Sequence, residues 1–192
     1  MSKPTRRRMV VTSYNPEWPR LYREERSLLC AILGTSILRI HHIGSTAIPG
    51  MCAKPIIDML GETQGLALVD ALSPELQKAG YAAKGENGIP GRRYFRKGNP
   101  LLHTHHLHVF GVGDANIERH LAFRDYLRSH ARVAKSYCEL KQELAVEFEY
   151  DPAGYQEGKS ELASALEAQA LRWYRRTGRS ARAVQSADGS PQ

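Results

Sequence analysis

The sequence predicts a mixed α/β (α+β) protein in which a small β-sheet is flanked by helices and followed by a helical C-terminal part. Two observations favour this class. Residues 37–43 and 56–60 are short apolar runs joined through a Gly-Ser turn, which is typical of neighbouring buried strands. From about residue 116 the apolar residues recur at helical spacing instead. Strands followed by a run of helices indicate a sheet packed against helices.

The individual elements follow from periodicity and from residues that start or stop helices. Expected strands lie at 9–12 (a short strand or lead-in), 37–43, 56–60, 81–84, 92–97 and 105–112. Expected helices lie at 16–33, 66–79, 116–128, 131–150 and 155–174. The first helix begins after Asn15-Pro16 and ends at Gly34, whereas Ser73-Pro74 is expected to break the second.

Length and composition indicate one folded domain at 9–176. The chain has 192 residues, 42% of them hydrophobic and 24% charged, which is enough for a substantial core. Residues 1–8 are basic and residues 177–192 are mostly small or polar, so both ends are expected to be disordered tails.

Net charge, cysteine content and the absence of long apolar runs indicate the kind of partner and the cellular location to expect. The net charge of +7 favours an anionic partner, but many arginines lie near the two ends, so a small anionic ligand such as a nucleotide is favoured over nucleic acid. Three dispersed cysteines suggest neither a disulfide framework nor a zinc knuckle. No apolar run approaches the roughly 20 residues of a membrane helix, and no signal peptide is recognisable, so a cytoplasmic location is expected.

One acidic residue lies within an apolar strand and is the main functional clue. Asp58 interrupts the run at 56–60, and a buried carboxylate needs a compensating partner. The Gly44-Ser45-Thr46 turn lies 13 positions before it, counted from Ser45. Glycine admits an anion to the backbone amides and serine adds a hydroxyl donor. Asp58 could therefore hold a metal ion against a phosphate bound at this turn.

Histidines and basic residues extend the candidate site. His106 and His108 lie on one face of the expected strand at 105–112, where imidazoles can bind a metal or transfer protons. If that strand neighbours the Asp58 strand, the three residues share one site. Several basic residues could surround it, and Lys54 is tied to the site by its position between the turn and Asp58. These basic residues are Lys54, Arg92, Arg93, Arg96, Arg124, Arg128, Lys141 and Lys159.

The usual motifs of other enzyme classes are absent from the sequence. It has no Walker-type loop, no Gly-x-Ser-x-Gly elbow, no Cys-x-x-Cys pair and no His-Glu-x-x-His helix. These absences argue against the commonest kinase, esterase and zinc-protease layouts.

Several sequence blocks, in order, resemble the GrpB (UPF0157) family over about Val10–Tyr174. They are HHIGSTAIPGMCAKPIIDML, GIPGRRYFRK, HHLHVF, HLAFRDYLRSH, YCELKQELAVEF and YQEGKSE. The resemblance implies a nucleotidyltransferase-like fold, and similar domains occur fused behind dephospho-coenzyme A kinases. In that superfamily a Gly-Ser turn holds nucleotide phosphates, and carboxylates on two strands hold two metal ions.

Carried onto this sequence, the superfamily pattern is incomplete. Gly44 and Ser45 match the turn and Asp58 matches the first acid, but Leu60 stands where the second acid is expected. His106 and His108 stand on the strand that should carry the third. One carboxylate supports two-metal transfer poorly.

Three functions are therefore expected as alternatives. The first is nucleotidyl transfer from a nucleoside triphosphate with a divalent metal, most simply Mg²⁺. In it Asp58 (with His108) binds metal, Gly44, Ser45 and Thr46 hold phosphate, Lys54, Arg92 and Arg124 neutralise charge, and His106 or His108 acts as base. The second is a non-catalytic module for a phosphorylated or acidic ligand, or a partner of an enzyme of coenzyme A synthesis. The third is a metal-dependent, hydrolase-type centre at Asp58, His106 and His108.

Overall fold

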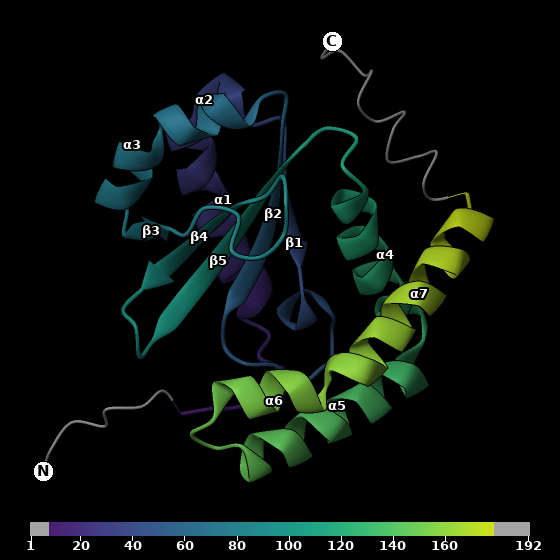
Figure 1. The fold of residues 1–192 in the computed structure, drawn as a ribbon. Helices are drawn as coiled ribbons and strands as arrows, with labels where there is room; N and C mark the ends of the chain where they lie inside the picture. Colours follow the sequence, from purple (N-terminus) through teal and green to yellow (C-terminus); the bar gives the residue numbers. More distant parts are fainter. Residues whose placement is uncertain (1–7, 179–192) are drawn as a thin grey trace, which may run out of the picture.

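Five strands form one mixed β-sheet in the computed structural model, which describes residues 8–178 (Figure 1). The strands are β1 (Arg39–Ile43), β2 (Ile57–Thr63), β3 (Tyr81–Ala83), β4 (Arg93–Gly98) and β5 (His103–Gly111). Their order across the sheet is β1-β2-β5-β4-β3. β2 and β5 run parallel, and the other neighbouring strands are antiparallel.

Helices cover both faces of this sheet (Figure 1). They are α1 (Trp18–Leu33), α2 (Leu66–Ala71), α3 (Ser73–Lys78), α4 (Ala115–Ser129), α5 (Ala131–Glu147), α6 (Pro152–Gly158) and α7 (Ser160–Arg176). Short 3₁₀ helices, η1 (Gly34–Ser36) and η2 (Ser45–Ala47), flank β1. The predicted mixed α/β class with a helical C-terminal part is confirmed.

Side chains on alternate faces of β2 and β5 belong to two separate apolar clusters. Met59 and Leu107 are fully buried in a cluster with side chains of α1, α2 and α3. Leu60 and Phe110, one register step away on the opposite face, are fully buried in a cluster with α4, α5 and α7. The period of two that predicted these strands therefore also assigns each residue to a helical layer.

The strand boundaries differ modestly from the prediction. β2 continues to Thr63 and β5 begins at His103, because pairing with neighbouring strands extends both beyond their most apolar stretch. The segment at 9–12 forms a single bridge, Thr12 to Ala53, so it is a lead-in and not a full strand.

The single helix predicted at 155–174 is wrong, because the chain forms two helices, α6 and α7. The break lies at Lys159, after Gly158. A Cβ at Gly158 would lie 2.6 Å from a methyl group of Leu144, so this glycine permits close packing of α6 on α5. Periodicity alone could not detect the break, because both helices keep compatible apolar spacing.

The structure contains one disulfide, although the three dispersed cysteines of the sequence suggest no disulfide framework. Cys52 and Cys138 form a disulfide across 86 residues of sequence, with Cα atoms 5.5 Å apart. Only the fold brings the loop before β2 onto α5, so spacing could not predict this pair. Cys30 remains a free thiol.

The predicted tails at 1–8 and 177–192 lie largely outside the described residues. Within the described part, Arg8 donates to Glu149 at 2.6 Å and the backbone N–H of Thr177 donates to Trp173. None of the helices between residues 8 and 178 combines the length and apolar character that a membrane span requires.

Candidate active site

The candidate site lies on the sheet face that packs against α4, α5 and α7. Asp58 of β2 pairs with His106 of β5 and with Ile43 of β1. Paired residues of neighbouring strands point to the same face, and His108 follows two positions later on that face. One candidate ligand atom from each of Asp58, His106 and His108 lies within 4.8 Å of the others. The structure thus brings together the three residues that the sequence could only suppose to be neighbours.

The Gly-Ser turn directly adjoins the Asp58 carboxylate. Gly44 follows Ile43, the residue paired with Asp58, and has a φ of 69°. A Cβ at position 44 would lie 2.6 Å from Asp58 Oδ2. Both the left-handed backbone and the close approach favour glycine at this position. A phosphate at the turn and a cation at Asp58 would therefore be neighbours.

A chain of hydrogen bonds connects Asp58 to two histidines. Asp58 Oδ1 accepts from His106 Nδ1 at 2.9 Å, and His106 Nε2 lies 3.3 Å from His103 Nδ1. Because a carboxylate only accepts, neutral His106 carries its hydrogen on Nδ1. Burial acts to raise the pKa of Asp58, but the His106 hydrogen bond and nearby imidazoles outweigh it and lower that pKa. Asp58 is therefore ionised at neutral pH, and its side chain keeps 30% exposure.

Arg92 determines which nitrogen of His108 carries the hydrogen. This arginine is 5% exposed and donates to the carbonyls of Glu86 and Asn87 at 3.1 and 2.7 Å. Its Nη1 lies 3.2 Å from His108 Nδ1 and can only donate, so His108 carries its hydrogen on Nε2. Burial and the Arg92 charge outweigh the opposing charge of Asp58 and lower the pKa of His108 to about 4, so the imidazole is neutral at pH 7.

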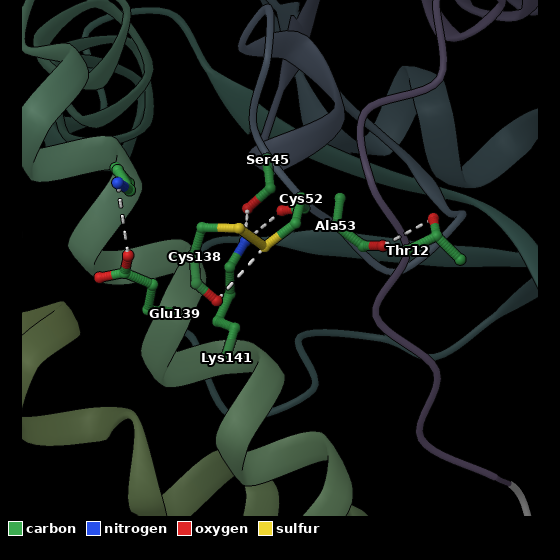
Figure 2. The surroundings of a disulfide bond; sticks show 8 residues. Thr12, Ser45, Cys52, Ala53, Cys138, Glu139 and Lys141 are labelled. Carbon is green, nitrogen blue, oxygen red and sulfur yellow. Dashed lines mark hydrogen bonds and ion pairs between the residues drawn. A yellow bond between two sulfur atoms is a disulfide. The ribbon is translucent and has the colours of Figure 1, made fainter.

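A buried lysine from α5 holds the serine of the turn. Lys141 Nζ donates to Ser45 Oγ at 2.9 Å and to the Cys52 carbonyl at 2.6 Å (Figure 2). Lys141 is only 4% exposed. Burial, together with the charges of Lys159 and Lys54, lowers the pKa of its ammonium to about 7. A proton on this amine is therefore weakly held and would be favoured by an added anion.

Lys54 and Lys159 approach the same region from two other segments. Their ammonium groups lie 3.9 and 5.8 Å from the centre of the Tyr155 ring. Burial lowers the pKa of Lys159, and the Asp58 charge opposes this shift. With Lys141, a loop, α5 and the α6–α7 junction each contribute one lysine within electrostatic range of the others.

Two predicted phosphate ligands support the backbone around the turn. Thr46 is 1% exposed, and its hydroxyl lies 3.0 Å from His42 Nε2 and 3.3 Å from the Ile56 carbonyl. Arg124 donates to the His42 carbonyl at 3.2 Å and to Asp125 at 2.7 Å. Both side chains therefore make hydrogen bonds that hold the backbone around the turn in place.

The position expected for a second acid is part of the core. Leu60 has no exposed surface and packs with Phe110 and helix side chains. The next residue of β2 on that face is Glu62, which lies 2.6 Å from His41 Nε2. Asp58 is therefore the one acidic side chain that β2 contributes to the centre of the site.

The donor atoms fit a magnesium ion that is shared with a phosphate ligand. Mg²⁺ commonly binds one or two carboxylates together with substrate phosphates and water, which Asp58 and the turn could supply. Two imidazoles and a carboxylate are a set that suits softer metals. Here, however, Asp58 and Arg92 engage Nδ1 of His106 and His108. His108 could ligate through Nε2 only with its hydrogen on Nδ1, which requires Arg92 to leave that nitrogen.

Comparison with known proteins establishes the family. A family model described as GrpB protein matches residues 8–169. The chain belongs to the GrpB family. It is 45% identical over 168 residues to the UPF0157 protein YqkA of Bacillus subtilis, which covers 88% of this chain and 49% of that protein. The chain therefore spans about half the length of this relative.

Two other GrpB proteins are covered almost completely. The glutamate-rich protein GrpB of Alkalihalophilus pseudofirmus is 35% identical, with 82% of this chain and 93% of that protein aligned. The crystal structure of the conserved protein GrpB from Enterococcus faecalis has a TM-score of 0.83 at 40% identity, covering 86% of this chain and 99% of that one.

Two more distant proteins are similar to only part of this chain. Half of this GrpB chain is 33% identical to 26% of a dephospho-CoA kinase of Mycolicibacterium paratuberculosis. A solved structure of the Cid1 poly(U) polymerase aligns with 68% of this chain and 45% of its own at 13% identity and a TM-score of 0.48.

Two parts of the site are not evident from the sequence of this GrpB chain. Lys141 is one of several basic residues without a distinguishing feature in the sequence, and its contact with Ser45 joins residues 96 positions apart. His103 was expected to precede the strand, but it begins β5 and contacts His106. The sole signal in the sequence was the density of histidines at 103–108.

Proposed function

We propose that this GrpB chain binds the phosphates of a nucleoside triphosphate together with one Mg²⁺ ion and transfers a nucleotidyl group to a small acceptor. The observation that carries the proposal is the close approach of Gly44, in the turn, to the Asp58 carboxylate, which leaves no room for a Cβ at position 44. A phosphate-binding turn and a metal-binding carboxylate must be adjacent if one cation is to bridge them.

The surrounding side chains support binding of a polyanion. The Ser45 hydroxyl and the backbone N–H groups of the turn would donate hydrogen bonds to phosphate. Lys54 and Lys141 would neutralise phosphate charge from two sides, and Arg92 could exchange its His108 contact for a phosphate oxygen. When bound, Mg²⁺ would neutralise charge on the phosphates.

His106 is the candidate general base. The hydrogen bond from its Nδ1 to Asp58 fixes the ring and leaves Nε2 as the basic nitrogen. In this structure that nitrogen faces His103. An acceptor hydroxyl would have to take the place of His103 before His106 could receive its proton.

Isothermal titration calorimetry with ATP, GTP, CTP and UTP, each with and without Mg²⁺, tests the binding step. We expect at least one nucleotide to bind, with a marked dependence on Mg²⁺. Asp58→Asn should remove that dependence, whereas Asp70→Asn should not, because Asp70 pairs with Arg93 elsewhere on the molecule. If none of the four nucleotides binds in either condition, the proposal fails. Release of pyrophosphate would report transfer.

A second candidate function is a binding module without catalysis. It is favoured by Leu60, which leaves the site with one strand carboxylate where transfer normally uses two or three. The Nε2–H of His108 and the lysines would then bind a phosphorylated ligand directly, in this protein alone or beside a coenzyme A-synthesising enzyme. This alternative predicts binding that persists in EDTA and no release of pyrophosphate.

A further inference from the structure

The disulfide lies between the phosphate turn and α5. Cys52 is in the loop that connects η2 to β2, and Cys138 is in the first half of α5 (Figure 2). Ser45 begins η2, directly before this loop, and Lys54 lies in the loop after Cys52. The covalent bond therefore joins the phosphate-binding loop to the helical part of the molecule.

A second link joins the same two segments. Lys141 follows Cys138 by three residues, and its ammonium donates to Ser45 Oγ and to the carbonyl of Cys52 itself (Figure 2). Residues three apart on a helix lie on adjoining faces, so the disulfide and the lysine point to the same side of α5. The disulfide thus fixes the carbonyl that positions Lys141 against the turn.

The fold has other means of stability than this bridge. Separate apolar clusters fill both faces of the sheet, and residues 48 and 51 of the same loop are already buried in one of them. A chain of 192 residues can bury a core large enough to fold without a disulfide. The position of the bridge beside the site therefore needs an explanation beyond stability.

An open cavity gives access to the bridge. It has a volume of about 230 Å³, is open to solvent and is lined by Met51, Arg128, Ala134, Lys135 and Cys138, among others. Arg128 and Lys135 give it positive charge, which favours the approach of a thiolate. On the other side, the Lys141 ammonium at the Cys52 carbonyl would stabilise a thiolate leaving from Cys52.

We propose that the Cys52–Cys138 bridge is a reversible redox site that fixes or releases the phosphate turn. A thiolate of a small dithiol attacks Cys138 Sγ, the sulfur–sulfur bond breaks, and Cys52 departs as a thiolate that takes up a proton. The second thiol of the reductant then displaces Cys138 and forms the disulfide of the reductant. Two electrons pass to the protein, and two cysteine thiols result.

Reduction would leave the loop attached to α5 by the Lys141 hydrogen bonds and by the apolar packing of residues 48 and 51, with no covalent link. The turn would then sample more conformations, and the amides, Ser45 and Lys54 would have to be ordered when a phosphate binds. Weaker nucleotide binding after reduction is the functional consequence, and this part rests on the proposed function.

The test uses the full chain, either oxidised or treated with dithiothreitol, and alkylation followed by mass spectrometry to report the bridge. Hydrogen exchange of the amides at 44–54 should be faster after reduction, and ATP–Mg²⁺ should bind about tenfold more weakly. The Cys52→Ser/Cys138→Ser variant should behave like the reduced protein under both conditions. Cys30→Ser, which removes the free thiol on α1, should respond like the unchanged chain.

Two results would overturn the inference: a bridge that resists dithiothreitol in the folded protein, or full reduction with unchanged exchange at 44–54. Exchange needs no ligand, so the two proposals fail separately. If the oxidised protein binds no nucleotide, the proposed function is lost, while faster exchange after reduction still supports redox release of the turn.

Discussion

The buried amine of Lys141 should make the unfolding free energy of the protein depend on pH. Its pKa is about 7 in the folded protein against a usual value of 10.5, so between these values the unfolded chain binds more protons. The unfolding free energy should therefore rise with pH over this window and be flat below about pH 7. Each pH unit in the window contributes about 1.4 kcal/mol, so the rise from about pH 6 to about pH 9.5 should be about 3 kcal/mol.

The substitution Lys141→Met should remove this rise. Methionine keeps an unbranched apolar side chain but has no proton to lose. The free energy lost with the two Lys141 hydrogen bonds should be the same at every pH. The difference in unfolding free energy between the two proteins, measured by urea denaturation at several pH values, should therefore change by about 3 kcal/mol.

The matched control for this experiment lies on the same helix. Lys135 also belongs to α5, but its side chain is 79% exposed. Lys135→Met should leave the pH dependence as it is in the unchanged chain. Parallel pH curves for the Lys141→Met protein and the unchanged chain would refute the buried, weakly protonated amine.

Three further substitutions test the geometry around the site. Gly44→Ala should cost about 2–4 kcal/mol, because it adds a clash with the facing carboxylate to the strain of a positive φ; Gly50→Ala, with a φ of 77° and nothing within 4 Å, should cost only about 1–2 kcal/mol in urea titrations. An equal loss for both glycines would contradict the close contact. Leu60→Asp should cost at least about 4 kcal/mol by burying an uncompensated carboxylate, and an unchanged urea midpoint would show that the position is not core. Arg92→Met should raise the pKa of His108 above about 4, because it removes a nearby positive charge; an unchanged titration of the imidazole by NMR would contradict the contact.

Much of the fold could be predicted because local patterns and tertiary packing agree. Apolar runs at 37–43 and 56–60 became β1 and β2, and Ser73-Pro74 marks the start of α3 after α2 ends. The helix expected at 155–174 is instead two helices, α6 and α7, and Gly158 at the end of α6 lies close to Leu144 of another helix. Packing against a residue that is distant in sequence leaves little trace in periodicity.

The sequence by itself determined the candidate centre: a glycine-serine turn, one carboxylate in an apolar strand, and histidines at alternate positions of a later strand. Alternation placed these residues on one face, because the side-chain period of a strand is two. Tertiary structure alone decided that β2 lies beside β5, that Arg92 fixes the tautomer of His108, and that Cys52 and Lys141 hold the turn to α5. These contacts join residues 16 to 89 positions apart, and such pairings depend on the packing of whole elements, which no local pattern encodes.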